Sequence, residues 1–214
     1  MSDLVFYTNP QSRGQTVRWM LEEVGQPYET EVLDYLTTMK TEPYLSINPM
    51  GKVPAIRHNG KVVTEVAAIC CYLADAFPDA NLAPPPADRA DYYRWIFFTS
   101  GPVEAAFSNK AAGWEPTPER QRMFGYGNYD LAINTLEKAL SGREYIAADY
   151  FTAADLFVGA NVNFMLAFNL LEPKPVFTDY ARRMTDRDAY RRAKDIDAAL
   201  LAELQARQEP ANAE

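Results

Sequence analysis

The sequence is poor in histidine and cysteine. Its 214 residues include one histidine, His58, and two adjacent cysteines, Cys70 and Cys71. A single histidine argues against a His-rich metal site and against a Ser-His-Asp hydrolase. Neighbouring cysteines rarely bridge each other, so no disulfide framework is expected. We therefore expect a reduced protein without a bound metal, in which both cysteines are buried packing residues.

Long apolar runs and clusters of positive charge are also missing. No stretch approaches the ~20 apolar residues of a membrane span, and the N-terminus lacks the basic region and long apolar run of a signal peptide. Acidic residues outnumber basic ones by 29 to 21, whereas a nucleic-acid binder usually shows a basic patch. These absences predict a cytoplasmic protein that binds neither membrane nor nucleic acid.

The composition is that of an ordinary globular protein, with 48% hydrophobic and 23% charged residues. The chain changes character at Pro84-Pro85-Pro86, because three consecutive prolines form a stiff spacer that cannot lie within a helix. We expect a first domain over residues 1–80, a proline-rich linker over 81–86 and a second domain over 87–214.

Short strands alternate with helices in the first part of the chain. The patterns predict strands over residues 4–7, 28–33, 53–57 and 61–64, and the last two form a hairpin through Asn59-Gly60. Helices are predicted over residues 12–24, weakly over 39–46, and over 65–77. Ser12 and Gln15 predict a capping box at the start of the first helix.

The second part has helical patterns almost to its end. Apolar stripes follow residues 129–140 and 193–204, and Thr152 with Asp155 predicts another capping box. Such stripes favour antiparallel helices in a bundle. The predicted fold class is therefore α/β followed by all-α.

This layout resembles that of the cytosolic glutathione S-transferases, and bacterial relatives with Pro-x-Ser-Arg resemble it best. The segments that carry the resemblance are residues 6–14, 17–25, 47–54 and 64–69. The resemblance covers about the full length and implies an N-terminal thioredoxin-like domain followed by an all-helical domain. It also implies a homodimeric transferase that takes glutathione as co-substrate and detoxifies apolar electrophilic small molecules.

Such a transferase must present a thiolate near neutral pH, because the thiolate is the nucleophile. A free thiol has a pKa of ~8.5, and lowering it by about 2 units takes roughly 2.7 kcal/mol. Free N–H groups and the dipole at a helix N-terminus, together with a hydroxyl, supply this interaction. The turn after the first strand offers such groups at Gln11, Ser12, Arg13 and Gly14.

Two hydroxyls compete for the role of donor to the thiolate. Ser12 is the first candidate, although a helix-capping role competes for the same oxygen. Tyr7 is the rival, because the resemblance to the tyrosine-type classes places a tyrosine at the end of the first strand. Arg13 is expected to supply positive charge to the sulfur or to a carboxylate of the tripeptide.

The resemblance implies further contacts with glutathione. Pro54 resembles the family's cis-proline, and the backbone of Val53 pairs with the cysteinyl part like an added strand. Lys52 meets the glycyl carboxylate, and Glu65 meets the γ-glutamyl ammonium. Val66 departs from the family, where a serine hydroxyl helps to hold the γ-glutamyl carboxylate, so one side-chain donor is lost.

A pocket for the apolar electrophile is expected between the two domains. Its expected walls are one proline and several aromatic side chains: Tyr7, Pro10, Phe107, Trp114, Phe164 and Phe168. Two other functions stay open. One is a glutathione-dependent disulfide reductase or peroxidase, and the other is a non-catalytic glutathione-binding or interaction protein of the same fold.

Overall fold

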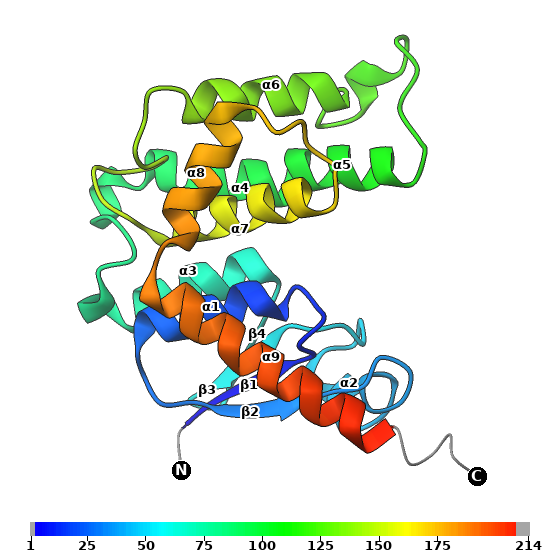
Figure 1. The fold of residues 1–214 in the computed structure, drawn as a ribbon, viewed down its shortest axis with the longest axis vertical. Coiled ribbons are helices and arrows are strands. Elements are labelled where there is room, and N and C mark those ends of the chain that lie inside the picture. The colour runs from blue at the N-terminus through cyan, green and yellow to red at the C-terminus, as the bar shows by residue number, and fades with distance from the viewer. Residues whose placement is uncertain (1–2, 209–214) are drawn as a thin grey trace. The chain divides into compact units, whose positions relative to one another are not determined.

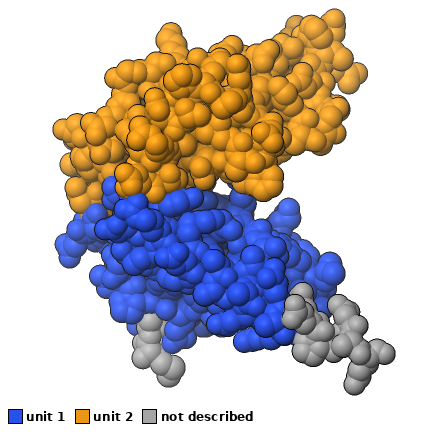
Figure 2. All heavy atoms as spheres, in the orientation of Figure 1, with its two compact units in different colours: residues 1–80, 187–214 blue, residues 81–186 orange. Residues whose placement is uncertain are grey.

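The structure is a computed structural model that describes residues 3–208. The chain divides into two compact units, residues 1–80 with 187–214 and residues 81–186 (Figure 2). The first unit holds a four-stranded sheet and its helices, and the second is built from helices (Figure 1). This arrangement confirms the predicted fold class, a thioredoxin-like α/β domain followed by an all-helical one.

The sheet has the strand order β2-β1-β3-β4. The strands are β1 (Leu4–Thr8), β2 (Glu29–Val32), β3 (Ala55–His58) and β4 (Lys61–Thr64). β1 is parallel to β2 and antiparallel to β3, which pairs with β4 in an antiparallel hairpin. The predicted turn of this hairpin is confirmed, because Asn59 and Gly60 have φ of 50° and 73°, as a tight two-residue turn requires.

Side chains of β1 alternate between the two faces of the sheet. Phe6 faces α1 (Gly14–Val24), where the guanidinium carbon of Arg18 lies 4.9 Å from the ring centroid. Tyr7 faces the other way, into a core shared with η1 (Thr38–Lys40) and α2 (Tyr44–Ile47). α3 (Val66–Ala76) packs beside α1, so the sheet is covered on both faces.

Two predicted helices differ from the observed ones. α1 begins at Gly14, and the capping box predicted for Ser12 and Gln15 is wrong. The Gln15 side chain instead donates to the Pro10 carbonyl at 2.6 Å. The weak helix predicted over residues 39–46 is split into η1 and α2, because Pro43 lies between them and cannot donate a helical hydrogen bond.

The second unit is helical, as predicted. Its elements are η3 (Pro86–Asp88), α4 (Ala90–Phe98), the π-helical turn η4 (Thr99–Val103), α5 (Glu104–Ala111), η5 (Gln121–Met123), α6 (Tyr129–Leu140), α7 (Ala153–Ala167) and α8 (Pro175–Thr185). The capping box predicted at the start of α7 is confirmed: the Thr152 side chain accepts from the backbone of the first turn, and Asp155 accepts from the Thr152 N–H.

The last helix belongs to the first compact unit, whereas the sequence boundary assigned residues 87–214 to the helical domain. α9 (Asp188–Gln208) packs along α1 (Figure 1). Arg18 of α1 pairs with Asp197 of α9 at 3.1 Å, and Glu22 of α1 pairs with Arg192 of α9 at 3.2 Å. Arg187, just before α9, pairs with Glu23 of α1 at 2.6 Å. The apolar stripe of α9 fits any helix partner, so the sequence alone did not identify which surface it covers.

Two features are absent from the described part of the chain. Within residues 3–208, no helix is long and apolar enough to cross a membrane. Over the same residues, no group of three His, Cys, Asp or Glu side chains gathers where it could hold a metal ion.

Candidate functional site

The strand register brings three predicted site segments to one end of the sheet. Tyr7 in β1 lies opposite Ala55 in β3, and Ala55 lies opposite Thr64 in β4. The turn after β1, the Val53–Pro54 pair before β3 and the start of α3 after β4 therefore lie at the same end. These segments, together with Tyr7 in β1 and Lys52 just before Val53, contain the residues predicted to contact glutathione, and they all belong to the first unit.

Hydrogen bonds within the turn fix the Ser12 hydroxyl. The Ser12 Oγ donates to the Asn9 carbonyl at 2.7 Å and accepts from the Gly14 N–H at 2.9 Å. A Cβ at Gly14 would lie 2.0 Å from the Thr8 Oγ1, so only glycine lets α1 start this close to β1. Ser12 is half-buried and stands at the N-terminal end of α1, where the helix dipole favours an anion.

The two neighbours of Ser12 in the turn have different surroundings. Gln11 is exposed, and its N–H donates to the Asn9 Oδ1 at 3.0 Å. Arg13 is half-buried and takes the N-cap position of α1 without capping it through its side chain. Pro10, which begins the same turn, is buried.

The loop before β3 presents the backbone of Val53. The Val53–Pro54 bond is cis, as the resemblance implied. The Lys52 carbonyl accepts hydrogen bonds from the Tyr44 hydroxyl and from the Asn48 Nδ2, the latter at 2.8 Å. Val53 is half-buried, whereas the Lys52 side chain is exposed. Two side chains thus hold the peptide next to Val53 in place.

Glu65 has an unusual backbone conformation at the start of α3. Its φ of 68° and ψ of 120° put a residue with a Cβ in a region that glycine favours. Strain of this kind costs roughly 1–3 kcal/mol and is concentrated at functional sites. The Glu65 side chain is exposed and does not cap α3, and Val66 is half-buried. The first N–H groups of α3 have no acceptor within the helix, as at every helix N-terminus.

Tyr7 lies in the core of the first unit. It is 2% exposed, and its ring centroid is 5.7 Å from that of Tyr44. Burial, reinforced by the charge of Glu31, raises the pKa of the Tyr7 hydroxyl. A buried phenol with a raised pKa is a poorer candidate than Ser12 for contact with a ligand.

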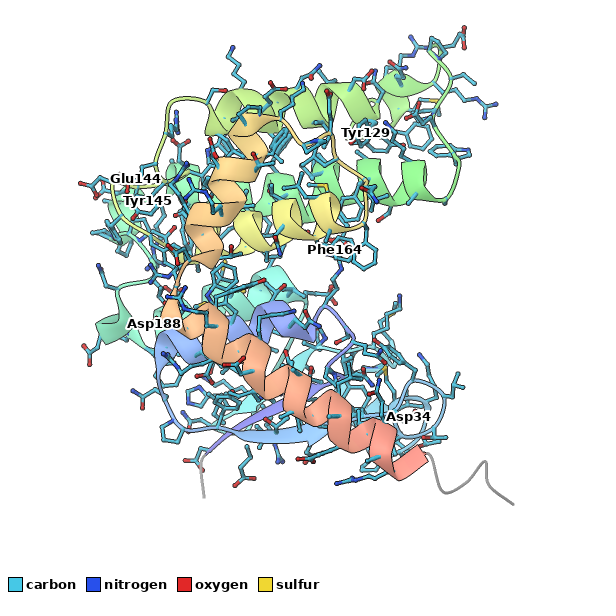
Figure 3. The ribbon with its side chains drawn as sticks, in the orientation of Figure 1. Asp34, Tyr129, Glu144, Tyr145, Phe164 and Asp188 are labelled. Atoms are coloured by element: carbon cyan, nitrogen blue, oxygen red, sulfur yellow. The ribbon has the colours of Figure 1, made fainter. Side chains whose placement is uncertain are left out.

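The aromatic residues predicted as pocket walls in the second unit form two groups. The ring centroid of Phe164, labelled in Figure 3, lies 6.0 Å from that of Phe107 and 4.6 Å from that of Phe168. Trp114 pairs with Phe124 at 5.2 Å. Phe107 is buried, but Phe168 and Trp114 are 63% and 43% exposed, so part of this aromatic surface is open.

The sulfur and imidazole groups lie away from the predicted site. Cys70 is buried in α3, and burial raises the pKa of its thiol well above the ordinary range. Cys71 is only half-buried, so its predicted burial is wrong. His58 ends β3, where its Nδ1 lies 3.0 Å from the Tyr72 hydroxyl and its ring centroid lies 5.1 Å from that of Phe77.

Sequence reasoning missed the residues that support the site. Asn9 holds the turn through both its side chain and its carbonyl, and Asn48 and Tyr44 hold the Lys52 peptide. Asn9 precedes a proline and Asn48 precedes Pro49, and this Asn-Pro turn signal was the available clue. Nothing in the sequence indicated the third partner, Tyr44.

The fold defines a class of protein: a thioredoxin-like domain with the candidate site at one end of its sheet, followed by a helical domain. Residues 12–76 match the family model described as glutathione S-transferase, N-terminal domain. This match and curated relatives that are named glutathione S-transferase support the predicted family, that of the glutathione S-transferases. This confirms the predicted family and the predicted class of enzyme.

Curated relatives support this assignment along most of the chain. The protein LigF of a Sphingobium species is 29% identical over 181 residues, which cover 65% of this chain and 67% of LigF. Glutathione S-transferase GstA of Escherichia coli O157:H7 is 27% identical over 174 residues, or 78% of this chain and 85% of GstA.

A solved structure agrees with the fold. A sphingomonad glutathione S-transferase complexed with glutathione matches with a TM-score of 0.71 and 25% identity, covering 91% of this chain and 98% of that protein. A glutathione transferase from Methylococcus capsulatus matches with a TM-score of 0.75 at 24% identity. That second likeness speaks for the fold alone.

Proposed function

We propose that this chain binds glutathione at the end of the sheet where the turn after β1, Val53 and the start of α3 meet. It then holds the glutathione sulfur as a thiolate and transfers it to an apolar electrophile. The proposal rests on the strand register: Tyr7 lies opposite Ala55, and Ala55 lies opposite Thr64. This register brings the three segments to the same end of the sheet. The sphingomonad relative bound to glutathione supports the choice of ligand.

Each part of the tripeptide has a proposed partner. The Val53 backbone pairs with the cysteinyl part, in the manner of an added strand. Glu65 takes the γ-glutamyl ammonium, and the N–H groups that open α3 take the γ-glutamyl carboxylate. Lys52, exposed beside Val53, takes the glycyl carboxylate. Val66 offers only its backbone N–H, so we expect the γ-glutamyl end to be held with one hydrogen bond fewer.

The thiolate is stabilised at the N-terminal end of α1. Ser12 donates its hydroxyl hydrogen to the sulfur, Gln11 lines the turn, and Arg13 adds positive charge. The buried position of Tyr7 and its raised pKa support Ser12 over Tyr7 as the donor. The Ser12 hydroxyl donates its hydrogen to the Asn9 carbonyl, so the hydroxyl must turn from that carbonyl to donate to the sulfur.

The reaction is a nucleophilic substitution or addition at carbon. The thiol proton leaves to solvent when glutathione binds, and a sulfur lone pair then forms the S–C bond. In a substitution the leaving group, for example a halide, departs with the bonding electrons. Binding supplies proximity, and donors already in place stabilise charge on the sulfur.

The electrophile is proposed to be apolar and aromatic. Tyr7 and Pro10 of the first unit are buried, so we no longer expect them to provide much open surface. Phe164, Phe168 and Trp114 of the second unit offer exposed or half-buried rings, which suit an aromatic acceptor. The homodimer, the cytoplasmic location and the role in detoxification stay predictions.

Two measurements test the proposal. Titration calorimetry with glutathione at millimolar concentration should give a heat of association. A chloronitrobenzene acceptor should then be conjugated, and Ser12→Ala should lower the turnover about tenfold or more, because it removes a hydrogen bond to a charged group. Tyr7→Phe should change the turnover little.

Ser46→Ala is a matched control for Ser12→Ala. The Ser46 Oγ donates to the carbonyl three residues earlier, as the Ser12 Oγ does, but Ser46 lies within α2 and is exposed. Binding of glutathione without turnover of electrophile, peroxide or disulfide would favour the non-catalytic binding protein. Turnover of peroxide or disulfide alone would favour the reductase or peroxidase.

A further inference from the structure

Gln15 lies in the first turn of α1, three residues after Ser12. Its side-chain Nε2 donates to the Pro10 carbonyl at 2.6 Å, and its backbone N–H donates to the Ser12 carbonyl at 3.2 Å. Pro10 and Ser12 both belong to the turn after β1, which carries the proposed donor to the thiolate. Gln15 therefore holds this turn against α1 at two points.

The peptide between Pro10 and Gln11 is held from both sides. Its carbonyl accepts from the Gln15 Nε2, and its N–H donates to the Asn9 Oδ1 at 3.0 Å. The Asn9 Nδ2 in turn donates to the Leu33 carbonyl at 2.9 Å, just after β2. Both polar groups of the peptide are thus paired, so it cannot rotate without breaking a hydrogen bond.

Lys194 of α9 fixes the orientation of the Gln15 amide. Its Nζ donates to the Gln15 Oε1 at 3.1 Å. An ammonium only donates and a carbonyl only accepts, so one orientation of the amide satisfies both partners, with Oε1 toward Lys194 and Nε2 toward the Pro10 carbonyl. One turn further along both helices, Arg18 pairs with Asp197 at 3.1 Å and holds α9 against α1.

Ser12 needs a rigid backbone to act on the sulfur. Its hydroxyl donates to the Asn9 carbonyl at 2.7 Å, and in the proposed function it turns from there to the sulfur. The Ser12 N–H donates to the same carbonyl at 3.0 Å. If the turn keeps its shape, only the side-chain torsion changes. An error of about 1 Å in the position of a reacting group can cost about a hundredfold in rate, so the side chains that hold the Pro10 peptide matter for the chemistry.

We propose that Gln15 is a positioning residue: by holding the Pro10 carbonyl, it keeps Ser12 where its hydroxyl meets the glutathione sulfur. Lys194 supports this role by orienting the Gln15 amide. The inference rests on the proposed function, since it concerns the same sulfur. Gln15 acts through Ser12, and its amide gives up no proton in the reaction.

The pKa of the bound glutathione thiol, read from the ultraviolet absorbance of the thiolate, tests the proposal. Gln15→Met keeps the length of the side chain and removes both its donor and its acceptor. We expect it to raise that pKa by about half a unit, because Ser12 then donates a weaker hydrogen bond to the sulfur. Turnover of a chloronitrobenzene acceptor at about pH 6 should fall about threefold, and the loss should narrow as rising pH ionises the thiol in both proteins. The dissociation constant of glutathione, measured well below the thiol pKa, should change less than about twofold, because other residues hold the tripeptide.

Gln121→Met is the matched control. Gln121 is also half-buried, and its Oε1 accepts from the Asn128 Nδ2 at 2.9 Å, but it lies on η5 of the other unit. This variant should leave the thiol pKa unchanged. An unchanged thiol pKa in Gln15→Met would overturn the inference, even if that variant were less stable. A wild-type protein that binds glutathione and lowers its thiol pKa keeps the proposed function intact in that case, whereas a wild type that does not bind overturns both.

Lys194→Met tests the link to α9 in a variant that should fold, because Lys194 is exposed. If Lys194 orients Gln15, Lys194→Met should raise the thiol pKa by less than Gln15→Met does. It should then have no further effect in the Gln15→Met background, because the two residues act as one unit. An unchanged thiol pKa in Lys194→Met would overturn the orienting role. An effect that persists in the Gln15→Met background and shrinks at high salt would overturn it too, because Lys194 would then act only through its charge.

Discussion

Among residues 3–208, each compact unit buries an aspartate, and the two carboxylates are held by different means. Asp155 in the helical unit is 0% exposed and accepts from the Ile146 N–H at 2.7 Å, the Thr152 N–H at 3.0 Å and the Tyr180 hydroxyl at 3.0 Å. Asp197 in the sheet unit is 4% exposed and pairs with Arg18 at 3.1 Å. One carboxylate is held by neutral donors and the other by a cation.

The environments of Asp155 and Asp197 differ in how they stabilise the fold. The donors to Asp155 are neutral, and most lie within ten residues, so the network is largely local. Asp197 depends on a guanidinium 179 residues away in the sequence. A buried ion pair contributes little net stability but is costly to break, because the remaining charge is left without a counterion. The ion pair thus determines where α9 docks more than how stable the unit is.

The largest effect is expected from breaking the ion pair. Asp197→Ala leaves Arg18, which is 1% exposed, without its counterion, and should lower the free energy of unfolding by about 4 kcal/mol. Urea denaturation measures the loss, and hydrogen exchange should locate it in α1 and α9. Asp188→Ala, which removes an exposed ion pair of the same helix with Arg191, should cost less than about 1 kcal/mol.

Removing both charges sharpens this test. The double variant Arg18→Met with Asp197→Leu should recover most of the loss, because it leaves no unpaired charge in the interior. If the double variant is as unstable as Asp197→Ala, the charge is not the cause and the packing of these side chains is.

A smaller loss is expected from Asp155→Ala. It leaves the Ile146 and Thr152 N–H groups without an acceptor, and an unsatisfied buried donor costs roughly 1–3 kcal/mol. We expect a loss of about 3 kcal/mol in urea denaturation, with faster hydrogen exchange confined to the helical unit. Asp179→Ala, an exposed aspartate on α8, is the control. A loss for Asp155→Ala no larger than for this control would contradict the importance of the network.

The same contrast explains what the sequence could predict. The capping box at Thr152 was predictable because Asp155 follows it by three residues, and that spacing alone determines the geometry. The pairing of Arg18 with Asp197 was not predictable, because no periodicity relates residues that far apart. The prediction of one helix over residues 39–46 followed the apolar pattern and did not take account of the break at Pro43.

In the candidate site, too, the sequence predicted local features better than contacts between distant residues. The positions of Ser12, Val53 and Glu65 follow from the order of strands and helices, which the sequence predicted well. The capping box at Ser12 failed because the Ser12 Oγ bonds to the Gly14 N–H and the Asn9 carbonyl instead. The support from Asn9 and Asn48 depends on loops that fold back on themselves, and no spacing rule describes such loops.

Thr152→Ala should have a smaller effect than the loss of Asp155. The Thr152 Oγ1 accepts from the Ala154 N–H at 3.2 Å and donates to Asp155 at 2.9 Å, and loss of such a cap costs about 1 kcal/mol. Urea denaturation should show this loss, and Thr152→Ser should recover most of it. Failure of the serine variant would mean that the methyl group, rather than the hydroxyl, stabilises the start of α7.

The smallest expected effect is on how stability depends on pH, and it should differ between Asp155 and Asp197. Burial raises the pKa of Asp155, although its hydrogen bonds oppose the shift. The folded protein therefore holds more protons than the unfolded chain above the ordinary pKa of ~3.9. The stability contributed by this group is complete below that pKa and is lost as pH rises through the folded value. Relative to Asp155→Asn, which cannot titrate, the wild type should lose stability as pH rises above about 4.

Asp197 should show a weaker version of this dependence. Burial raises its pKa as well, but the positive charge of Arg18 opposes the shift, whereas only neutral donors oppose it at Asp155. Urea denaturation of wild type, Asp155→Asn and Asp197→Asn at several pH values measures both slopes. A wild type that gains stability over Asp155→Asn as pH rises would mean that the neutral donors outweigh burial. The network would then hold the carboxylate as an anion without the help of a cation.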